Sequence, residues 1–246
     1  MTDTPGLDPI TLEILFNGLR SITDETFIAL TRSAYLTNIK ERRDHSIAIC
    51  DPRGRLIVQA ENSIPIHLAS MIGLMDSLLA KFAPDDIREG DLFVANDPHV
   101  AGGTHLPDIN MAAPVFAAGT LVGFICNIAH HADVGGMAPG SMAGGMSEIY
   151  QEGLRIPVVR LFREGQIQQD LFDLLLLNVR LPDERRGDYF AQIAACRLGA
   201  RRLLEMIKST GWRGCAPPSK TSSAAPSGAC ATACRGFPTA SIVSRM

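Results

Sequence analysis

The sequence lacks an excess of either charge and lacks a long apolar run. Its 246 residues include 23 Lys and Arg against 26 Asp and Glu, so composition gives no electrostatic reason to expect nucleic acid or an anionic membrane as a partner. The longest stretch without charged residues, 109–132, is interrupted by Pro114, Gly119 and Gly123, which indicates a strand pair rather than a membrane helix. The N-terminus carries Asp3 where a secretion signal has a basic region. We therefore expect a cytoplasmic protein with no membrane partner.

Cysteine is scarce, with six residues in the whole chain. Cys230 and Cys234 are separated by three residues, not two, and no histidine follows them, which disfavours a zinc ribbon. A disulfide framework is not expected in a chain of this length without a secretion signal. The sequence also has no P-loop, no Gly-x-Gly-x-x-Gly fingerprint and no Gly-x-Ser-x-Gly elbow, which argues against P-loop ATP binding, a Rossmann enzyme and a serine hydrolase.

Periodicity predicts a domain of helices and hairpins. Asp8 and Pro9 are a favourable cap and first residue for a helix that continues, whole or broken, to about residue 38. Further predicted elements are a hairpin of 46–50 with 55–60, a helix over 66–82, a strand at 91–95, a hairpin of 109–116 with 121–130, a strand at 154–162 and a helix from an Asp183 cap to 207. Segment 171–179 fits helix or strand equally well. Helices at both ends around hairpins indicate an α+β fold with a mixed, mainly antiparallel sheet.

Composition changes abruptly after Lys208. Residues 209–246 contain no Asp, Glu or Leu and have no helical or alternating pattern. We expect residues 1–208 to form the domain, and 209–246 to be a disordered tail that arose from a change of reading frame.

Histidines and carboxylates gather at one end of the second predicted hairpin. Segment 96–108 leads into this hairpin and segment 129–136 follows it. With the turn near residues 118–119, Asp108 lies beside residues 129–131 on the neighbouring strand, at a Cβ separation of about 4.5–5.5 Å. These polar side chains therefore converge at the ends of two adjacent strands.

The converging residues have the chemistry of a metal site. His105 precedes Asp108 by three residues, and the strand register decides whether His130 or His131 shares the face of Asp108. Two imidazoles and one carboxylate suit Zn, Fe, Ni or Cu, with Mn also allowed by the carboxylate, and leave positions open for water or substrate. The alternative is that these are polar loop residues that satisfy backbone groups beside the hairpin. The histidine left over, together with Asp133, is a candidate for orienting the ligands or for acid–base catalysis.

Weaker signals surround this cluster. Asp97 in the first segment is a further candidate acid or base. The glycine-rich loop offers Gly135, Gly136 and Ser141 as candidate substrate contacts, although such loops are more often merely flexible. Arg43 is a candidate for binding an acidic substrate, with solvated ion pairs as the default alternative.

Several motifs together resemble the hydantoinase B/oxoprolinase family. They cover residues 8 to about 207, in order and with matching spacing. The motifs are DPITLE at 8–13, NIKERRD at 38–44, NDP and GTHLPD within 96–108, HHADVGG at 130–136, PGS at 139–141 and EGLRIP at 152–157. Members of the family include the B components of N-methylhydantoinases, the C-terminal half of 5-oxoprolinase and the acetone carboxylase alpha subunit. Family members run several hundred residues, so the resemblance implies a truncated chain.

The resemblance implies a function and a partner. An ATPase partner of the hydantoinase A type binds ATP and magnesium and phosphorylates the substrate, and the B-type chain completes hydrolysis of the C–N bond of a hydantoin or 5-oxoproline-like ring. A hetero-oligomer acting on a small cyclic amide is therefore expected. The carboxylase branch implies manganese, with His105, Asp108 and His130 as ligands, leaving His131 and Asp133 beside them. Alternatives are an ATP-dependent ketone carboxylase and a non-catalytic scaffold.

Overall fold

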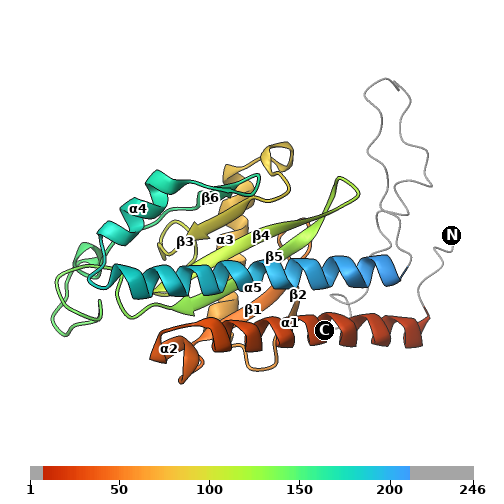
Figure 1. Cartoon of the computed structure of the whole chain (residues 1–246), viewed down its shortest axis with the longest axis horizontal. Coiled ribbons are helices and arrows are strands. Elements are labelled where there is room, and N and C mark those ends of the chain that lie inside the picture. The colour runs from red at the N-terminus through yellow and green to blue at the C-terminus, as the bar shows by residue number, and fades with distance from the viewer. Residues whose placement is uncertain (1–7, 211–246) are drawn as a thin grey trace.

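Helices cover both faces of a seven-stranded sheet in the computed structural model, which describes residues 8–210 (Figure 1). The helices are α1 (Pro9–Ser33), α2 (Thr37–Lys40), α3 (Pro65–Lys81), α4 (Gln169–Leu177) and α5 (Pro182–Ser209), with short 3-10 turns η1 (Pro84–Asp86) and η2 (Ile149–Gln151). The strands are β1 (His45–Cys50), β2 (Leu56–Gln59), β3 (Leu92–Ala95), β4 (Asp108–Ala117), β5 (Thr120–His130), β6 (Val159–Arg163) and β7 (Gln166–Ile167). The predicted α+β class is confirmed. The expected tail lies, from residue 211 on, outside the described residues.

The strands lie in the order β2-β1-β5-β4-β3-β6-β7, and every pair in this sheet is antiparallel. Side chains on the central β4–β5 pair alternate between two apolar layers. Ala113 and Ile125, paired across the two strands, belong to the cluster beneath α1 and α5, whereas the next pair, Ala112 and Cys126, belongs to the cluster beneath α3. Because both faces are buried, a slip of one residue would place each side chain in the wrong layer, so packing fixes the register.

The first helix starts as predicted, and the helical stretch to about residue 38 is broken at residues 34–36, between α1 and α2. Asp8 Oδ1 accepts hydrogen bonds from the backbone N–H groups of Ile10 at 3.1 Å and Thr11 at 3.0 Å, which satisfies free donors of the first turn. The chain leaves helical geometry after Ser33 because the backbone N–H groups of residues 35 and 36 form hydrogen bonds outside the helix. Those of Tyr35 and Leu36 donate to Asp188 on α5, at 2.8 and 3.1 Å.

Two other boundaries depart from prediction, and one choice that the sequence left open is resolved. The ambiguous segment 171–179 contributes a helix, α4. The strand predicted from 154 begins only at Val159, because the backbone N–H of Ile156 donates to the Asn96 side chain at 2.6 Å instead of joining a ladder. The prediction of an Asp183 cap for α5 is wrong: Leu181 occupies the cap without a side-chain hydrogen bond, and Asp183 lies in the first turn. A carboxylate there still interacts favourably with the helix dipole.

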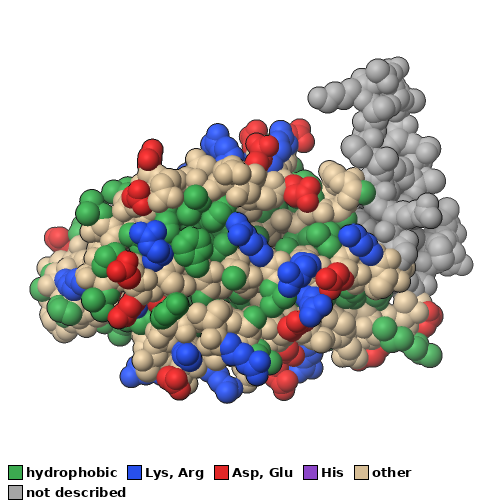
Figure 2. Space-filling model, in the orientation of Figure 1, with side chains coloured by type: hydrophobic (Ala, Val, Ile, Leu, Met, Phe, Trp, Pro, Cys, Tyr) green, Lys and Arg blue, Asp and Glu red, His purple; other side chains and the backbone are tan. Residues whose placement is uncertain are grey.

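The face covered by α1 and α5 carries interspersed acidic and basic side chains and displays no histidine (Figure 2). Both long helices lie side by side across it (Figure 1). No helix within residues 8–210 is both long enough and apolar enough to cross a membrane. Because this face displays no histidine, the histidines of the described residues are found elsewhere on the molecule.

Candidate metal centre

Two imidazoles and a carboxylate meet where β4 begins and β5 ends. His105 Nε2 lies 3.1 Å from Asp108 Oδ1, and His130 Nδ1 lies 3.2 Å from the same oxygen. The two ring nitrogens are also 3.2 Å apart. We call these three residues the His–Asp cluster. Its ligand atoms lie within 4.8 Å of one another.

The strand register creates this arrangement. Asp108 is the first residue of β4 and pairs directly with His130, the last residue of β5, so both side chains leave the sheet on the same face. His105 joins them through a tight turn in which the Asp108 N–H donates to the His105 carbonyl at 3.1 Å. The buried Asn96 amide holds this turn by donating to the Leu106 carbonyl at 2.8 Å.

The carboxylate of Asp108 is nearly fully buried, with a side chain 3% exposed. Burial alone would raise the pKa of Asp108, but hydrogen bonds with His105 and His130 hold that pKa well below its usual range. The same contact with Asp108 raises the pKa of His105. Thr104 Oγ1 donates to the second carboxylate oxygen. Asp108 is therefore an oriented, ionised carboxylate at neutral pH, as a candidate metal ligand needs to be.

Two residues beside the cluster were not among the predicted ligands. The Asp44 carboxylate approaches His130 Nδ1 at 3.9 Å and His67 Nε2 at 3.6 Å. His67 lies behind Asp108, 3.7 Å from Oδ2, and its other ring nitrogen contacts Ser46 Oγ at 3.1 Å. Asp44 reaches this place because β1, which follows it, pairs with β5. Strands β1 and β5 belong to different hairpins, so the local sequence pattern does not reveal this pairing. The sequence signal that could have identified Asp44 is the family motif NIKERRD at 38–44, which ends at this residue.

The size of the cluster fits a first-row divalent ion. Ligands about 2.0–2.1 Å from one ion lie about 3.0–3.4 Å apart in octahedral or tetrahedral geometry, which matches the three separations of 3.1, 3.2 and 3.2 Å. Asp44 adds a further carboxylate at the rim, 34% exposed. The ligand chemistry accommodates Mn, Fe or Zn.

His131, a predicted acid–base residue, lies away from the cluster. Its side chain is fully buried on the α5 side of the sheet, with Nε2 2.9 Å from Gln192 Oε1. Burial lowers the pKa of His131 to about 3, which keeps the ring neutral. The structure separates it from the ligands, because neighbouring residues on a strand point to opposite faces. Its acid–base role stays a prediction.

Asp133 and Asp97 each have a basic partner. Asp133 Oδ1 pairs with the Arg180 guanidinium at 2.7 Å. Asp97 Oδ2 pairs with Arg155 Nε at 2.5 Å, and its other oxygen accepts the His99 N–H at 2.8 Å. Neither carboxylate joins the His–Asp cluster, so both roles stay predictions, and both side chains organise loops.

The glycine-rich loop packs tightly against the segment that follows it. Ser141 is buried and its hydroxyl donates to the Gly135 carbonyl at 2.8 Å. At Gly136, φ is +80° and a Cβ would lie 2.4 Å from the Gln151 and Glu152 carbonyl oxygens. Arg43 is exposed, with φ +54°. Substrate contact by Gly135, Gly136, Ser141 and Arg43 stays a prediction. The geometry shows that two backbone segments cross closely at Gly136, which a residue without a Cβ permits.

Replacing Gly136 with alanine is expected to lower the free energy of unfolding by about 1–3 kcal/mol, because a methyl group there overlaps two backbone oxygens. Gly145→Ala is the matched control, since Gly145 has φ +82° but no neighbour within 4 Å. Urea unfolding of both variants separates crowding from backbone strain. Equal losses in both would show that the close crossing is unimportant.

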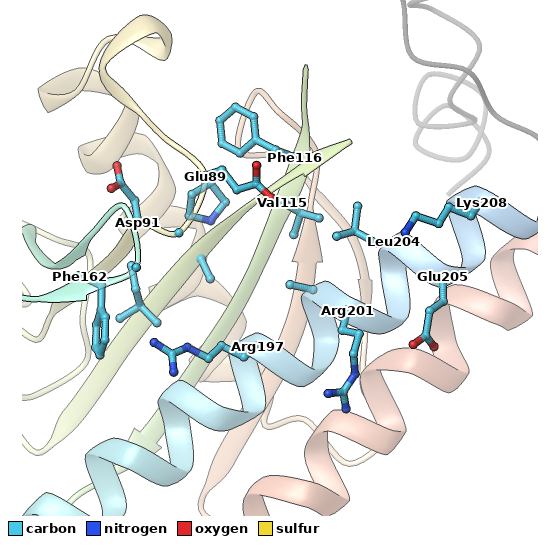
Figure 3. A pocket seen from close by; sticks show the side chains of 16 residues that line it. Glu89, Asp91, Val115, Phe116, Phe162, Arg197, Arg201, Leu204, Glu205 and Lys208 are labelled. Atoms are coloured by element: carbon cyan, nitrogen blue, oxygen red, sulfur yellow. The ribbon is translucent and has the colours of Figure 1, made fainter. Parts of the chain in front are cut away.

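A hollow of about 540 Å³ lies between the C-terminal half of α5 and strands β4, β3 and β6 (Figure 3). Arg197 extends from α5 toward Phe162, its guanidinium 4.8 Å from the ring centre. Phe116 and Leu204 contribute further apolar surface. None of the His–Asp cluster lines this hollow, so it is separate from the candidate metal chemistry.

Comparison with known proteins gives consistent matches. The family model described as Hydantoinase B/oxoprolinase matches residues 8–217. An uncharacterized protein, MJ0963, of Methanocaldococcus jannaschii is 42% identical over 84% of this chain and 37% of its own length. The beta subunit of the caprolactamase of Pseudomonas jessenii is 38% identical over 83% and 35% of the two chains. The B subunit of a putative D-/L-hydantoinase of Pseudomonas sp. (strain NS671) is 32% identical over 85% and 36%.

A solved structure extends the likeness to the fold. The crystal structure of the ATP-dependent caprolactamase from Pseudomonas jessenii superimposes with a TM-score of 0.77 at 37% identity, over 83% of this chain and 35% of that one. The chain thus spans little more than a third of the length of these relatives.

Proposed function

Because the chain belongs to the Hydantoinase B/oxoprolinase family, we propose that it is part of an ATP-dependent enzyme that hydrolyses the C–N bond of a cyclic amide. The observation that carries this proposal is the His–Asp cluster, whose three donor atoms have the separations that a divalent ion requires. Relatives named as components of a caprolactamase and of a hydantoinase support the same reaction class.

The chemistry of the amide explains why two activities are needed. An amide is a poor electrophile because its nitrogen donates electrons into the carbonyl. A hydantoinase A-type ATPase partner would transfer the terminal phosphoryl group of ATP, held with Mg²⁺, to the carbonyl oxygen, which makes the carbonyl carbon electrophilic. Water then adds to that carbon, the ring nitrogen leaves with a proton, and the acyl phosphate that remains is hydrolysed to a carboxylate and inorganic phosphate. The proposed assembly is therefore a hetero-oligomer in which this chain completes ring opening.

Three side chains would hold the ion, namely His105, Asp108 and His130. A divalent ion held there, manganese by family likeness, would supply Lewis-acid chemistry, by lowering the pKa of a water molecule and polarising a carbonyl. The chain itself orients the ligands: Thr104 and His67 contact the second oxygen of Asp108. Only His105 is substantially exposed among the three, at 34%, so it marks the side from which a substrate approaches.

Reconstitution with an ATPase of the hydantoinase A type tests the proposal. We expect ATP-dependent opening of at least one of hydantoin, 5-oxoproline and ε-caprolactam, and a loss of about a hundredfold or more in His105→Ala. His99→Ala is the matched control, because His99 is exposed and outside the cluster.

Three outcomes would contradict the proposal. Turnover that survives in His105→Ala while bound metal is lost would make the ion structural. Carboxylation of acetone without ring opening would assign the chain to ketone carboxylation. Absence of metal and of turnover with every substrate would favour a scaffold.

A further inference from the structure

A cavity of about 370 Å³ opens at the exposed side of the His–Asp cluster. His105 lines it, whereas the side chains of Asp108 and His130 are only 3% and 10% exposed. The rest of the lining comes from the glycine-rich loop and the turn after it: Ser141, Met142, Ala143, Met146 and Glu152. A small molecule in this cavity would therefore contact the cluster through His105.

Glu152 supplies the one carboxylate among the described residues of the lining. Its side chain is partly buried, and no ion pair within residues 8–210 occupies it. Its charge is near enough to act on His105. A partly buried acceptor facing a cavity gains from a ligand that brings a donor, because such a ligand restores a hydrogen bond lost to water.

The backbone fixes the position of Glu152. The Met137 N–H donates to the Gln151 carbonyl at 2.8 Å, and the Leu154 N–H donates to the Val134 carbonyl at 2.8 Å. Gly136 packs directly on the carbonyl of Glu152 itself. Backbone hydrogen bonds before and after Glu152 thus hold it against the segment that follows His130. The fold therefore fixes the distance between the backbone of Glu152 and the His–Asp cluster.

The remaining walls are apolar and adaptable. Met142 is 60% exposed, an unfavourable state for a large apolar side chain unless something covers it. Thioether side chains adjust to irregular apolar shapes. The described lining contains neither Lys nor Arg, and the two positive charges of an ion in the His–Asp cluster would be balanced by the carboxylates of Asp108 and Asp44, so an anionic group gains no surplus positive charge. The cavity suits a neutral molecule with one N–H donor and an apolar remainder.

We propose that this cavity binds the ring of a neutral lactam, with the Glu152 carboxylate accepting the ring N–H and with Met142 and Met146 covering the ring methylenes. The inference rests on the proposed function, which supplies the cyclic amide. It adds a preference: a ring acid such as 5-oxoproline places its carboxylate near Glu152 and is disfavoured, whereas 2-pyrrolidone, the same ring without the carboxylate, is favoured.

Paramagnetic line broadening tests this proposal without enzyme activity. The full chain is loaded with Mn²⁺, and the ring-proton linewidths of 2-pyrrolidone are titrated by NMR. We expect broadening with the unchanged chain and at least a tenfold weaker affinity in Glu152→Leu. Glu89→Leu is the matched control, because Glu89 lines the separate hollow. Equal broadening in Glu152→Leu and the unchanged chain would overturn the proposal.

A second arm isolates the charge. The unchanged chain is expected to bind 2-pyrrolidone at least tenfold more tightly than 5-oxoproline, and Glu152→Gln, which preserves shape, is expected to narrow that ratio. Tighter binding of 5-oxoproline to the unchanged chain would overturn the preference. Bound Mn²⁺ is counted separately by electron paramagnetic resonance. Failure to bind Mn²⁺ contradicts the proposed metal centre, whereas Mn²⁺ bound without broadening of 2-pyrrolidone contradicts only the cavity assignment.

Discussion

Replacing Asp108 with alanine is expected to weaken Mn²⁺ binding by about a hundredfold or more, because residues that merely orient metal ligands already contribute ~10–100-fold. Asp108 Oδ1 is the point that both imidazoles share, at 3.1 and 3.2 Å. Without it, His105 and His130 keep no common anionic partner, and two neutral imidazoles are a weak site for manganese. Equilibrium dialysis or electron paramagnetic resonance of free Mn²⁺ measures the change.

Asp76→Ala is the matched control for this metal-binding experiment. Asp76 lies on the exposed face of α3, outside the His–Asp cluster, so its removal should leave the Mn²⁺ affinity unchanged. Urea unfolding confirms that both variants remain folded. If Asp108→Ala bound Mn²⁺ as tightly as the control, the candidate metal centre would be wrong.

The largest effect on stability is expected from Asp188→Ala. Asp188 and Arg185 are ion-paired at 3.2 Å with side chains 0% and 1% exposed. Asp188 also accepts the N–H groups of Tyr35 and Leu36 where α1 ends, and burial raises its pKa. Within residues 8–210, its removal leaves the buried Arg185 guanidinium with the exposed Glu184 as its one remaining ion-pair partner. Breaking such a pair costs about 3–5 kcal/mol, which urea unfolding of the full chain would measure.

An exposed ion pair between the same two long helices provides the comparison. Glu25 on α1 and Arg202 on α5 lie 2.7 Å apart, with side chains 43% and 42% exposed. Surface pairs contribute about 0–1 kcal/mol because water screens the charges. Glu25→Ala should therefore lose far less stability than Asp188→Ala. Similar losses in the two variants would mean that burial of the Asp188 pair is unimportant.

Local sequence pattern correctly predicted the features of the fold that depend on residues close together in the chain. The cap at Asp8, the turn of the β4–β5 hairpin and the apolar stripe of α3 all depend on residues a few positions apart, and all three were predicted. The end of α1 was not, because Asp188 on α5 determines it from 153 positions away. The delayed start of β6 likewise depends on the distant side chain of Asn96.

The residues near the candidate site also fall into two groups, those placed by local sequence pattern and those placed by contacts between distant segments. His105, Asp108 and His130 belong to one hairpin, so turn position and strand periodicity predicted that they converge, with the choice of His130 over His131 coming from family likeness. Asp44 and Glu152 approach the cluster through contacts between separate segments, β1 on β5 and residue 152 on Gly136. Such contacts follow from packing of the whole sheet and loops, which periodicity does not describe.

The three candidate ligands are separated by at most 25 positions and lie on a hairpin at the centre of the sheet. Cross-linking so short a loop, already closed by strand pairing, removes little conformational entropy from the unfolded chain. We therefore expect this chain to fold without an ion and to bind one afterwards, unlike a zinc finger, whose folding energy comes from its ion. Ion identity then follows cellular supply and the intrinsic affinity series, in which zinc competes strongly with manganese, so the metal found after purification would depend on the growth medium.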